Sequence, residues 1–237
     1  MNIETLKTIQ ALRANGQALV RAVDLQSGEE LLIDPQDDSS ELALAARDAA
    51  RADKSGPVEI AGRDWFLGVF NPPLDLVIVG AAHIAQPLAA MAGLAGYGVR
   101  VIDPRTAFAT AARFPGVAIS HDWPDDALAK APLGPRSALV ALTHDPKVDD
   151  PALATALRST CFYVGALGSK KTHATRLERL KSHGFDSAAL ERIRGPVGLA
   201  IGAKSPAEIA ISILAEMTRE LRAGNEVGQT SRPRTSS

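Results

Sequence analysis

From Leu74 onward the sequence alternates short apolar runs with segments of helical character, and this alternation limits the possible folds more than any other feature. Apolar runs occupy residues 74–79, 99–102, 117–119, 138–142 and 162–164. Helices are predicted between them, at residues 84–95, 106–113, 125–131 and 150–159. Short runs without polar alternation are typical of strands covered on both faces. Strands that alternate with helices form a parallel sheet with right-handed crossovers. We therefore expect an α/β domain with a mostly parallel sheet over residues 74–223.

The first seventy residues have a different pattern, which predicts a small α+β domain over residues 1–71. Helical spacing of apolar residues covers 1–13, and an alanine-rich helix is expected at 40–52. Two hairpins are predicted, one joining 18–23 to 31–33 through Gly28 and one joining 58–60 to 65–70 through Gly62. The segment Asn71-Pro72-Pro73 then forms a stiff linker.

The last predicted helix has the clearest beginning in the sequence. Ser205-Pro206-Ala207-Glu208 combines an N-cap serine, a proline in the first turn and a glutamate three residues after the serine, which together form a capping box. Gly224 is predicted to end this helix. The polar residues 225–237 that follow are expected to be a disordered tail.

Charge and cysteine content exclude several classes of protein. The chain of 237 residues carries 26 basic and 27 acidic side chains, so it lacks the basic excess of a nucleic-acid or membrane-surface binder. Its single cysteine, Cys161, rules out an intrachain disulfide and a thiolate metal site, and its place before an apolar run favours a core residue over a nucleophile. We see neither a secretory signal nor an apolar run that could span a bilayer. A cytoplasmic protein is therefore expected.

The turn after the first strand of the sheet is the strongest candidate for ligand binding. Gly80-Ala81-Ala82-His83-Ile84-Ala85 is a weakened G-x-G-x-x-G/A fingerprint of a Rossmann-like domain, in which Gly80 permits the tight turn and Ala85 permits close packing of helix and strand. Ala82 replaces the central glycine, so its methyl group crowds the usual dinucleotide position without removing the anion site at the helix N-terminus. The alternative is a purely structural turn.

Further candidates follow the second and fourth strands. Asp103 is placed to accept hydrogen bonds from ribose hydroxyls, and Arg105 to pair with Asp103 or with a phosphate; a surface salt bridge is the alternative. His144, Asp145 and Lys147 lie together after the fourth strand. His144 is a candidate proton donor or ligand contact, or a structural histidine. Asp149 or Asp150 is a candidate N-cap of the next helix.

A second anion site is predicted after the fifth strand. Its residues are two glycines, a capping serine and two lysines at a helix N-terminus, namely Gly165, Gly168, Ser169, Lys170 and Lys171. A solvated basic face is the alternative, since Ala174, Leu177 and Leu180 define a core side of the same helix.

Several motifs in order make residues 74–222 resemble the C-terminal Rossmann domain of the xanthine dehydrogenase accessory (XdhC/CoxF-like) family. These are the Gly80 turn, Asp103-Pro104-Arg105, Arg113-Phe114-Pro115, Thr143-His144-Asp145-Pro146-Lys147, the segment 165–172, the segment 195–203, and Ser205-Pro206-Ala207-Glu208. The resemblance implies a chaperone that binds the molybdenum cofactor, as molybdopterin or its dinucleotide form, and inserts it into a molybdenum hydroxylase such as xanthine or carbon monoxide dehydrogenase. It also implies a homodimer and contact with a cysteine desulfurase.

Two departures from that family limit what the resemblance implies. The family commonly has glycine at the position of Ala82, which weakens the case for ordinary dinucleotide binding. Many members also have a longer N-terminal domain with cysteine motifs, and roles of those thiols do not transfer to this chain. Two other hypotheses stay open: an NAD-dependent oxidoreductase with His144 or His83 as its acid–base residue, and a cofactor-independent interaction module. The motifs favour carrying a cofactor without turnover.

Overall fold

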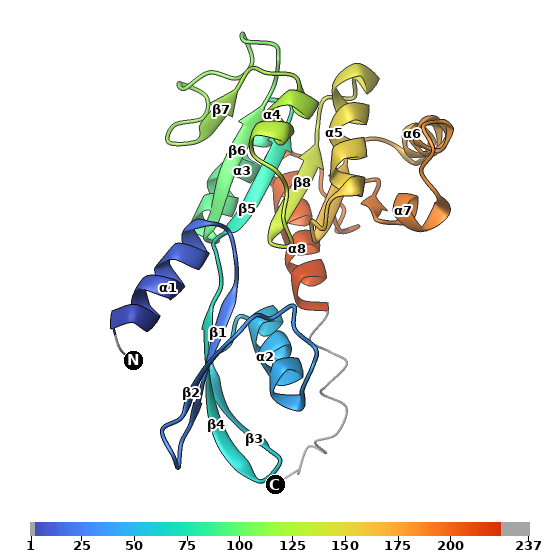
Figure 1. The fold of residues 1–237 in the computed structure, drawn as a ribbon. Coiled ribbons are helices and arrows are strands. Elements are labelled where there is room, and N and C mark those ends of the chain that lie inside the picture. The colour runs from blue at the N-terminus through green and yellow to red at the C-terminus, as the bar shows by residue number, and fades with distance from the viewer. Residues whose placement is uncertain (1–2, 224–237) are drawn as a thin grey trace, which may run out of the picture. The chain divides into compact units, whose positions relative to one another are not determined.

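The computed structural model describes residues 3–223, and the chain divides into two compact units (Figure 1). Of the described residues, the first unit comprises 3–72 and 221–223, and the second is Pro73–Glu220. The predicted disordered tail and the predicted helix end at Gly224 lie outside the described residues.

The first unit is an antiparallel sheet covered by a helix. Its elements are α1 (Ile3–Ala14), β1 (Leu19–Asp24), β2 (Glu30–Ile33), α2 (Glu41–Ala52), β3 (Gly56–Ile60) and β4 (Arg63–Phe70). The strand order is β2-β1-β4-β3, and both predicted hairpins are confirmed. Alternate strand residues, among them Val20 and Trp65, pack against the alanines of α2 in a core of their own.

The second unit contains a six-stranded sheet in which every strand pair is parallel. Its elements are β5 (Leu74–Val79), α3 (Ala85–Leu94), β6 (Tyr97–Ile102), β7 (Ala118–Ser120), α4 (Pro124–Lys130), β8 (Ser137–Ala141), α5 (Pro146–Arg158), β9 (Tyr163–Ala166), α6 (Lys170–Ser182), α7 (Ser187–Glu191), β10 (Ile193–Arg194) and α8 (Pro206–Ala223). The order β7-β6-β5-β8-β9-β10 is that of a Rossmann sheet: β6 and β7 follow β5 toward one edge, and β8, β9 and β10 lie toward the other, so the strand order reverses between β5 and β8. The predicted α/β fold with a Rossmann-like sheet is confirmed.

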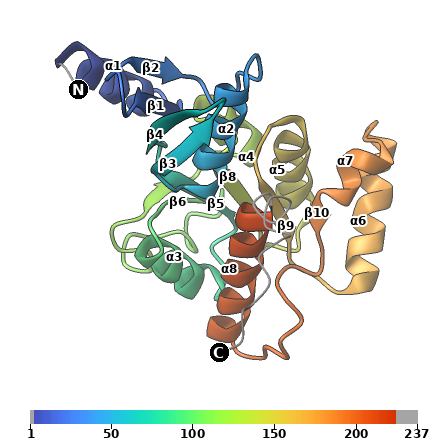
Figure 2. The same cartoon turned by 90° about the horizontal axis from the view of Figure 1, so that it is seen from below.

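Helices cover both faces of this sheet. α4 and α5 lie on one face, and α3 and α8 lie on the other (Figures 1 and 2). The central strands are apolar on both faces because both are covered: Leu76, Val77, Ile78 and Val79 are completely buried. Cys161 belongs to the core cluster beneath α5, as expected, and burial raises the pKa of its thiol.

Three local predictions in this unit are wrong. Residues 106–113 form turns instead of a helix. The N-cap of α5 is Asp145, whose carboxylate accepts the Lys147 N–H, so the helix begins at Pro146 and neither Asp149 nor Asp150 caps it. On α6, Ala174 is exposed, whereas Arg176 takes a buried place. The short elements α7 and β10 were not predicted.

The described part of the chain contains no helix that is both long and apolar enough to cross a bilayer.

Candidate functional site

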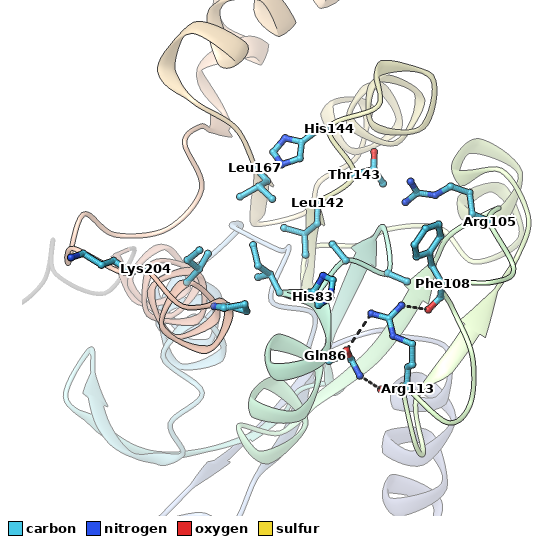
Figure 3. A pocket seen from close by; sticks show the side chains of 15 residues that line it. His83, Gln86, Arg105, Phe108, Arg113, Leu142, Thr143, His144, Leu167 and Lys204 are labelled. Atoms are coloured by element: carbon cyan, nitrogen blue, oxygen red, sulfur yellow. Dashed lines mark hydrogen bonds between the residues drawn. The ribbon is translucent and has the colours of Figure 1, made fainter.

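A pocket of about 700 Å³ opens where the strand order of the parallel sheet reverses, at the carboxyl ends of β5 and β8 (Figure 3). Ligands bind at this position in open α/β sheets. The lining residues come from five chain segments: Ala81, Ala82, His83, Ile84 and Gln86; Arg105, Phe108 and Arg113; Leu142, Thr143 and His144; Leu167; and Lys204, Pro206 and Ile209. Three of them are cationic and none carries a carboxylate, so the pocket attracts anions.

The glycine turn forms the floor of this pocket. Gly80 has φ +101°, and a Cβ there would lie 2.4 Å from Cγ2 of Thr143, so the turn requires glycine. Ala82, His83 and Ile84 follow it into the pocket lining. Among the described residues, no hydrogen bond engages the N–H groups of these three residues. They point the partial positive charge of the α3 N-terminus at whatever occupies the pocket.

Asp103 lies behind the pocket and not in its lining. Its carboxylate is completely buried and accepts hydrogen bonds from the Ala81 N–H at 2.8 Å, the Arg105 N–H at 3.0 Å, Arg105 Nε at 2.9 Å and Arg105 Nη2 at 2.8 Å. Burial alone would raise the pKa of Asp103, but the hydrogen bonds from Arg105 and Ala81 outweigh it and hold the pKa below its usual value. Asp103 thereby joins the glycine turn to the segment after β6.

Arg105 reaches from this carboxylate into the pocket. Its guanidinium lies over the ring of Phe108, with the central carbon 4.8 Å from the ring centroid. Arg113 lies on the same side, held by hydrogen bonds to the carbonyl of Phe108 and the side chain of Gln86. Figure 3 shows Lys204 at the opposite side of the pocket, and this residue lies in the loop just before α8.

The wall after β8 is shaped by a buried ion pair. Asp149 accepts hydrogen bonds from Thr143 Oγ1 at 2.7 Å and from the His144 N–H at 3.1 Å, which holds His144 at φ +64°. Arg176 lies 3.7 Å from the Asp149 carboxylate and donates to the Leu167 carbonyl at 2.8 Å. Both side chains are 2% exposed. Burial raises the pKa of Asp149 and lowers that of Arg176.

The structure brings some of the predicted site residues together and separates others. Ala82, His83, Ile84, Arg105 and His144 line the pocket. Gly80 and Asp103 support it from below. The remaining candidates, Asp145, Lys147, Gly165, Gly168, Ser169, Lys170 and Lys171, lie outside the lining. Ser169 caps α6 by accepting the Thr172 N–H, and Gly165 lies against Tyr163 and Val197. The second anion site stays a prediction.

Sequence reasoning missed Gln86, Phe108, Arg113 and Lys204 as pocket residues. None of them lies at a strand end, where the fold class predicts ligand contacts. The turn-rich segment after β6 brings Phe108 and Arg113 into the site, and the loop before α8 brings Lys204. Within the described residues, no group of three or more metal-binding side chains is found.

Comparison with known proteins gives consistent matches. Residues 76–217 match the XdhC Rossmann domain family. The chain is 32% identical over 148 residues to the molybdenum cofactor insertion chaperone PaoD of Escherichia coli, covering 62% of this chain and 40% of PaoD. It is 33% identical over 155 residues to a probable xanthine dehydrogenase subunit of Bacillus subtilis, covering 65% of this chain and 45% of that protein.

A solved structure shares the fold. A Bacillus halodurans protein described as a xanthine dehydrogenase superimposes with a TM-score of 0.72 at 22% identity, over 95% of this chain and 69% of that one. The matches to the two curated relatives span less than half of each relative's length.

Proposed function

This chain belongs to the family defined by the XdhC Rossmann domain, and on that basis we propose that it is an accessory protein that binds the molybdenum cofactor and delivers it to a molybdenum hydroxylase. Two relatives support the proposal, one named a cofactor insertion chaperone and the other a probable xanthine dehydrogenase subunit. The cofactor is cargo here: the chain carries it and does not use it in a reaction.

The observation that carries this proposal is the cationic pocket at the reversal of strand order. A molybdopterin bears a phosphate, and its dinucleotide form bears a pyrophosphate and a ribose. Free N–H groups at the start of α3, together with Arg105, Arg113 and Lys204, suit a phosphate or pyrophosphate. A cavity of about 700 Å³ falls within the range of pockets for ligands of this size. Phe108 and Ile209 supply apolar surface for a flat ring system.

A nicotinamide-dependent oxidoreductase is the less favoured function. It needs a residue that holds the ribose and an acid–base residue beside the nicotinamide. His83 and His144 are exposed in the pocket lining and stay candidates for the second role. The methyl group of Ala82 crowds the usual pyrophosphate position. Titration with NADH, followed by nicotinamide fluorescence, tests this alternative, and binding at micromolar concentration would favour it.

As partners we propose a molybdenum hydroxylase, a second copy of this chain in a homodimer, and a cysteine desulfurase. The first rests on the names of the relatives. The other two rest on the family resemblance alone. Sedimentation velocity of the purified chain tests the homodimer, and co-purification from cells tests both protein partners.

The decisive experiment uses the full chain and isolated molybdenum cofactor under anaerobic conditions. We expect the cofactor to co-elute with the chain in gel filtration and to activate a cofactor-free molybdenum hydroxylase when the loaded chain is added. Lys204→Gln should retain less cofactor, because Lys204 lines the pocket. Lys181→Gln is the matched control, since Lys181 is exposed on α6 outside this pocket. Absence of cofactor from the protein peak would refute the proposal.

A further inference from the structure

Asp103 lies at the position where many Rossmann domains bind a ribose, but here its carboxylate holds Arg105 in place. A carboxylate has about four lone-pair sites on its two oxygens. Four hydrogen bonds from Ala81 and Arg105 occupy them, two on each oxygen. The side chain is also completely buried and absent from the pocket lining. A ribose diol would have to displace bonds within the protein to reach this carboxylate.

Arg105, and not the Asp103 carboxylate, faces the pocket at the end of β6, and we refer to Asp103, Arg105 and Phe108 together as the corner of the pocket. The Arg105 side chain is 41% exposed and lines the pocket, while Nε and Nη2 are fixed on Asp103. Among the described residues, no hydrogen bond uses Nη1. Packing on Phe108 further restricts the guanidinium plane. The corner therefore presents a hydrogen-bond donor held in a defined direction, and no acceptor of its own.

The charges of this corner also matter. Asp103 and Arg105 form a pair whose net charge is close to zero, so the corner recognises a ligand by the direction of its N–H groups more than by net charge. Arg113 and Lys204 supply the positive charge of the pocket. A phosphate or a ring carbonyl, which only accepts hydrogen bonds, satisfies such a corner fully. A ribose diol, whose hydroxyl protons need acceptors, does not.

We infer that Arg105 is the specificity-determining residue of this pocket, that Asp103 is its positioning residue, and that together they select ligand groups that only accept hydrogen bonds over a ribose diol. This inference rests on the proposed function for the identity of the cargo. It deepens that function by naming the kind of ligand group, a hydrogen-bond acceptor, that binds at the end of β6. It also makes the corner a poor site for the adenosine ribose of NAD.

The test measures the affinity of the full chain for two probes by isothermal titration calorimetry. Inorganic pyrophosphate offers phosphate oxygens and no ribose, and adenosine diphosphate adds a ribose, together with adenine, to two phosphates. Arg105→Gln is expected to weaken pyrophosphate binding about ten- to hundredfold, the loss of one charged hydrogen bond. Asp103→Asn should change the affinities for pyrophosphate and for adenosine diphosphate by the same factor, because Asp103 acts through Arg105 and does not itself touch the ligand. The double variant should bind no more weakly than Arg105→Gln alone.

A matched control separates this effect from a general loss of an ion pair. Arg100 pairs with Asp75 through the same two-point geometry, with Nη2 2.7 Å from Oδ2, but lies outside the pocket lining. Arg100→Gln should leave both affinities unchanged. Thermal unfolding of every variant shows whether it is folded. If Asp103→Asn does not fold, Arg105→Gln and Arg105→Lys still test the role of Arg105. Arg105→Lys should bind pyrophosphate more tightly than Arg105→Gln, because it keeps the positive charge.

Three results would overturn the inference. One is an Asp103→Asn variant that loses adenosine diphosphate but keeps pyrophosphate, as a ribose acceptor would. Another is unchanged pyrophosphate affinity in Arg105→Gln, and a third is no pyrophosphate binding to the wild-type chain at millimolar concentration. Each is distinct from failure of the proposed function, because retention of molybdenum cofactor in gel filtration is measured separately.

Discussion

The contact between Gly80 and Thr143 leaves no room for a side chain at the floor of the pocket. We expect Gly80→Ala to lower the free energy of unfolding by about 2–5 kcal/mol, since positive φ costs an alanine about 1–2 kcal/mol and overpacking adds about 1–3 kcal/mol. The added Cβ would press on Cγ2 and the backbone nitrogen of Thr143, at 2.4 Å and 3.1 Å. Urea denaturation measures the change.

Gly96 provides a control for backbone strain alone. It also has positive φ, +87°, but nothing lies within 4 Å of a Cβ built there. Gly96→Ala should therefore cost only about 1–2 kcal/mol. Equal losses in the two variants would mean that the approach of Thr143 does not constrain the turn.

The lowered pKa of Asp103 makes part of the stability depend on pH. Because the folded-state pKa lies below the ordinary value of 3.8, the ionised carboxylate stabilises the fold above that value. This contribution is lost as pH falls from 3.8 through the folded-state pKa. We expect the Tm difference between wild type and Asp103→Asn to be full at pH 6 and to shrink below about pH 4. A constant difference down to about pH 2 would contradict the assignment.

Two arginines of α6 pair with neighbouring aspartates of α5 in different surroundings. Arg176 and Asp149 are buried, whereas Arg179 is 33% exposed and meets Asp150 at 2.6 Å. Removing one partner of a buried pair leaves an uncompensated charge, so Arg176→Met should cost about 3–5 kcal/mol. Arg179→Met should cost about 1 kcal/mol or less. Chemical denaturation of both variants measures this contrast, and a larger loss for Arg179→Met would disprove it.

Elements whose signals are local were predicted well from the sequence. The capping box of α8 is present as expected, with the Ser205 N–H donating to the Glu208 carboxylate at 2.9 Å and the Glu208 N–H donating to the Ser205 hydroxyl at 3.3 Å. The strand at Leu74–Val79 has the predicted bounds. In both cases neighbouring residues decide the structure, so no knowledge of the rest of the fold is needed.

Elements decided by tertiary packing were not predicted. Residues 106–113 form turns; Ala109 within this segment and Phe114 directly after it are buried. In a regular helix, positions five apart point about 140° away from each other, so one helix face could not bury both. The same segment places Phe108 and Arg113 in the pocket. Residues of the candidate site that belong to a strand-end motif could therefore be found from the sequence, and residues brought by irregular segments could not.

For the molecule as a whole, charge is unevenly distributed. The chain has a net charge of −1, yet the pocket lining has no carboxylate and three cationic side chains, of which Arg105 is paired with Asp103 while Arg113 and Lys204 supply positive charge. Raising ionic strength screens such charges, since the Debye length falls from about 10 Å at 0.1 M to about 3 Å at 1 M. We expect pyrophosphate affinity to fall with added salt, and to fall less steeply in Lys204→Gln. Calorimetric titrations at several salt concentrations measure the dependence of affinity on salt for the wild type and for Lys204→Gln. Equal dependence in the two proteins would mean that the charge of Lys204 does not contribute to pyrophosphate binding.

Cys161 is the only cysteine of the chain, 4% exposed, and burial raises the pKa of its thiol. A thiol in that state reacts slowly with maleimides, because the thiolate is the reactive form. The native chain is thus already suited to site-specific labelling. Lys147→Cys would introduce one reactive handle at the exposed first turn of α5, beside the wall that carries His144. A fluorophore attached there could report cargo loading and release in real time, in an otherwise unaltered protein.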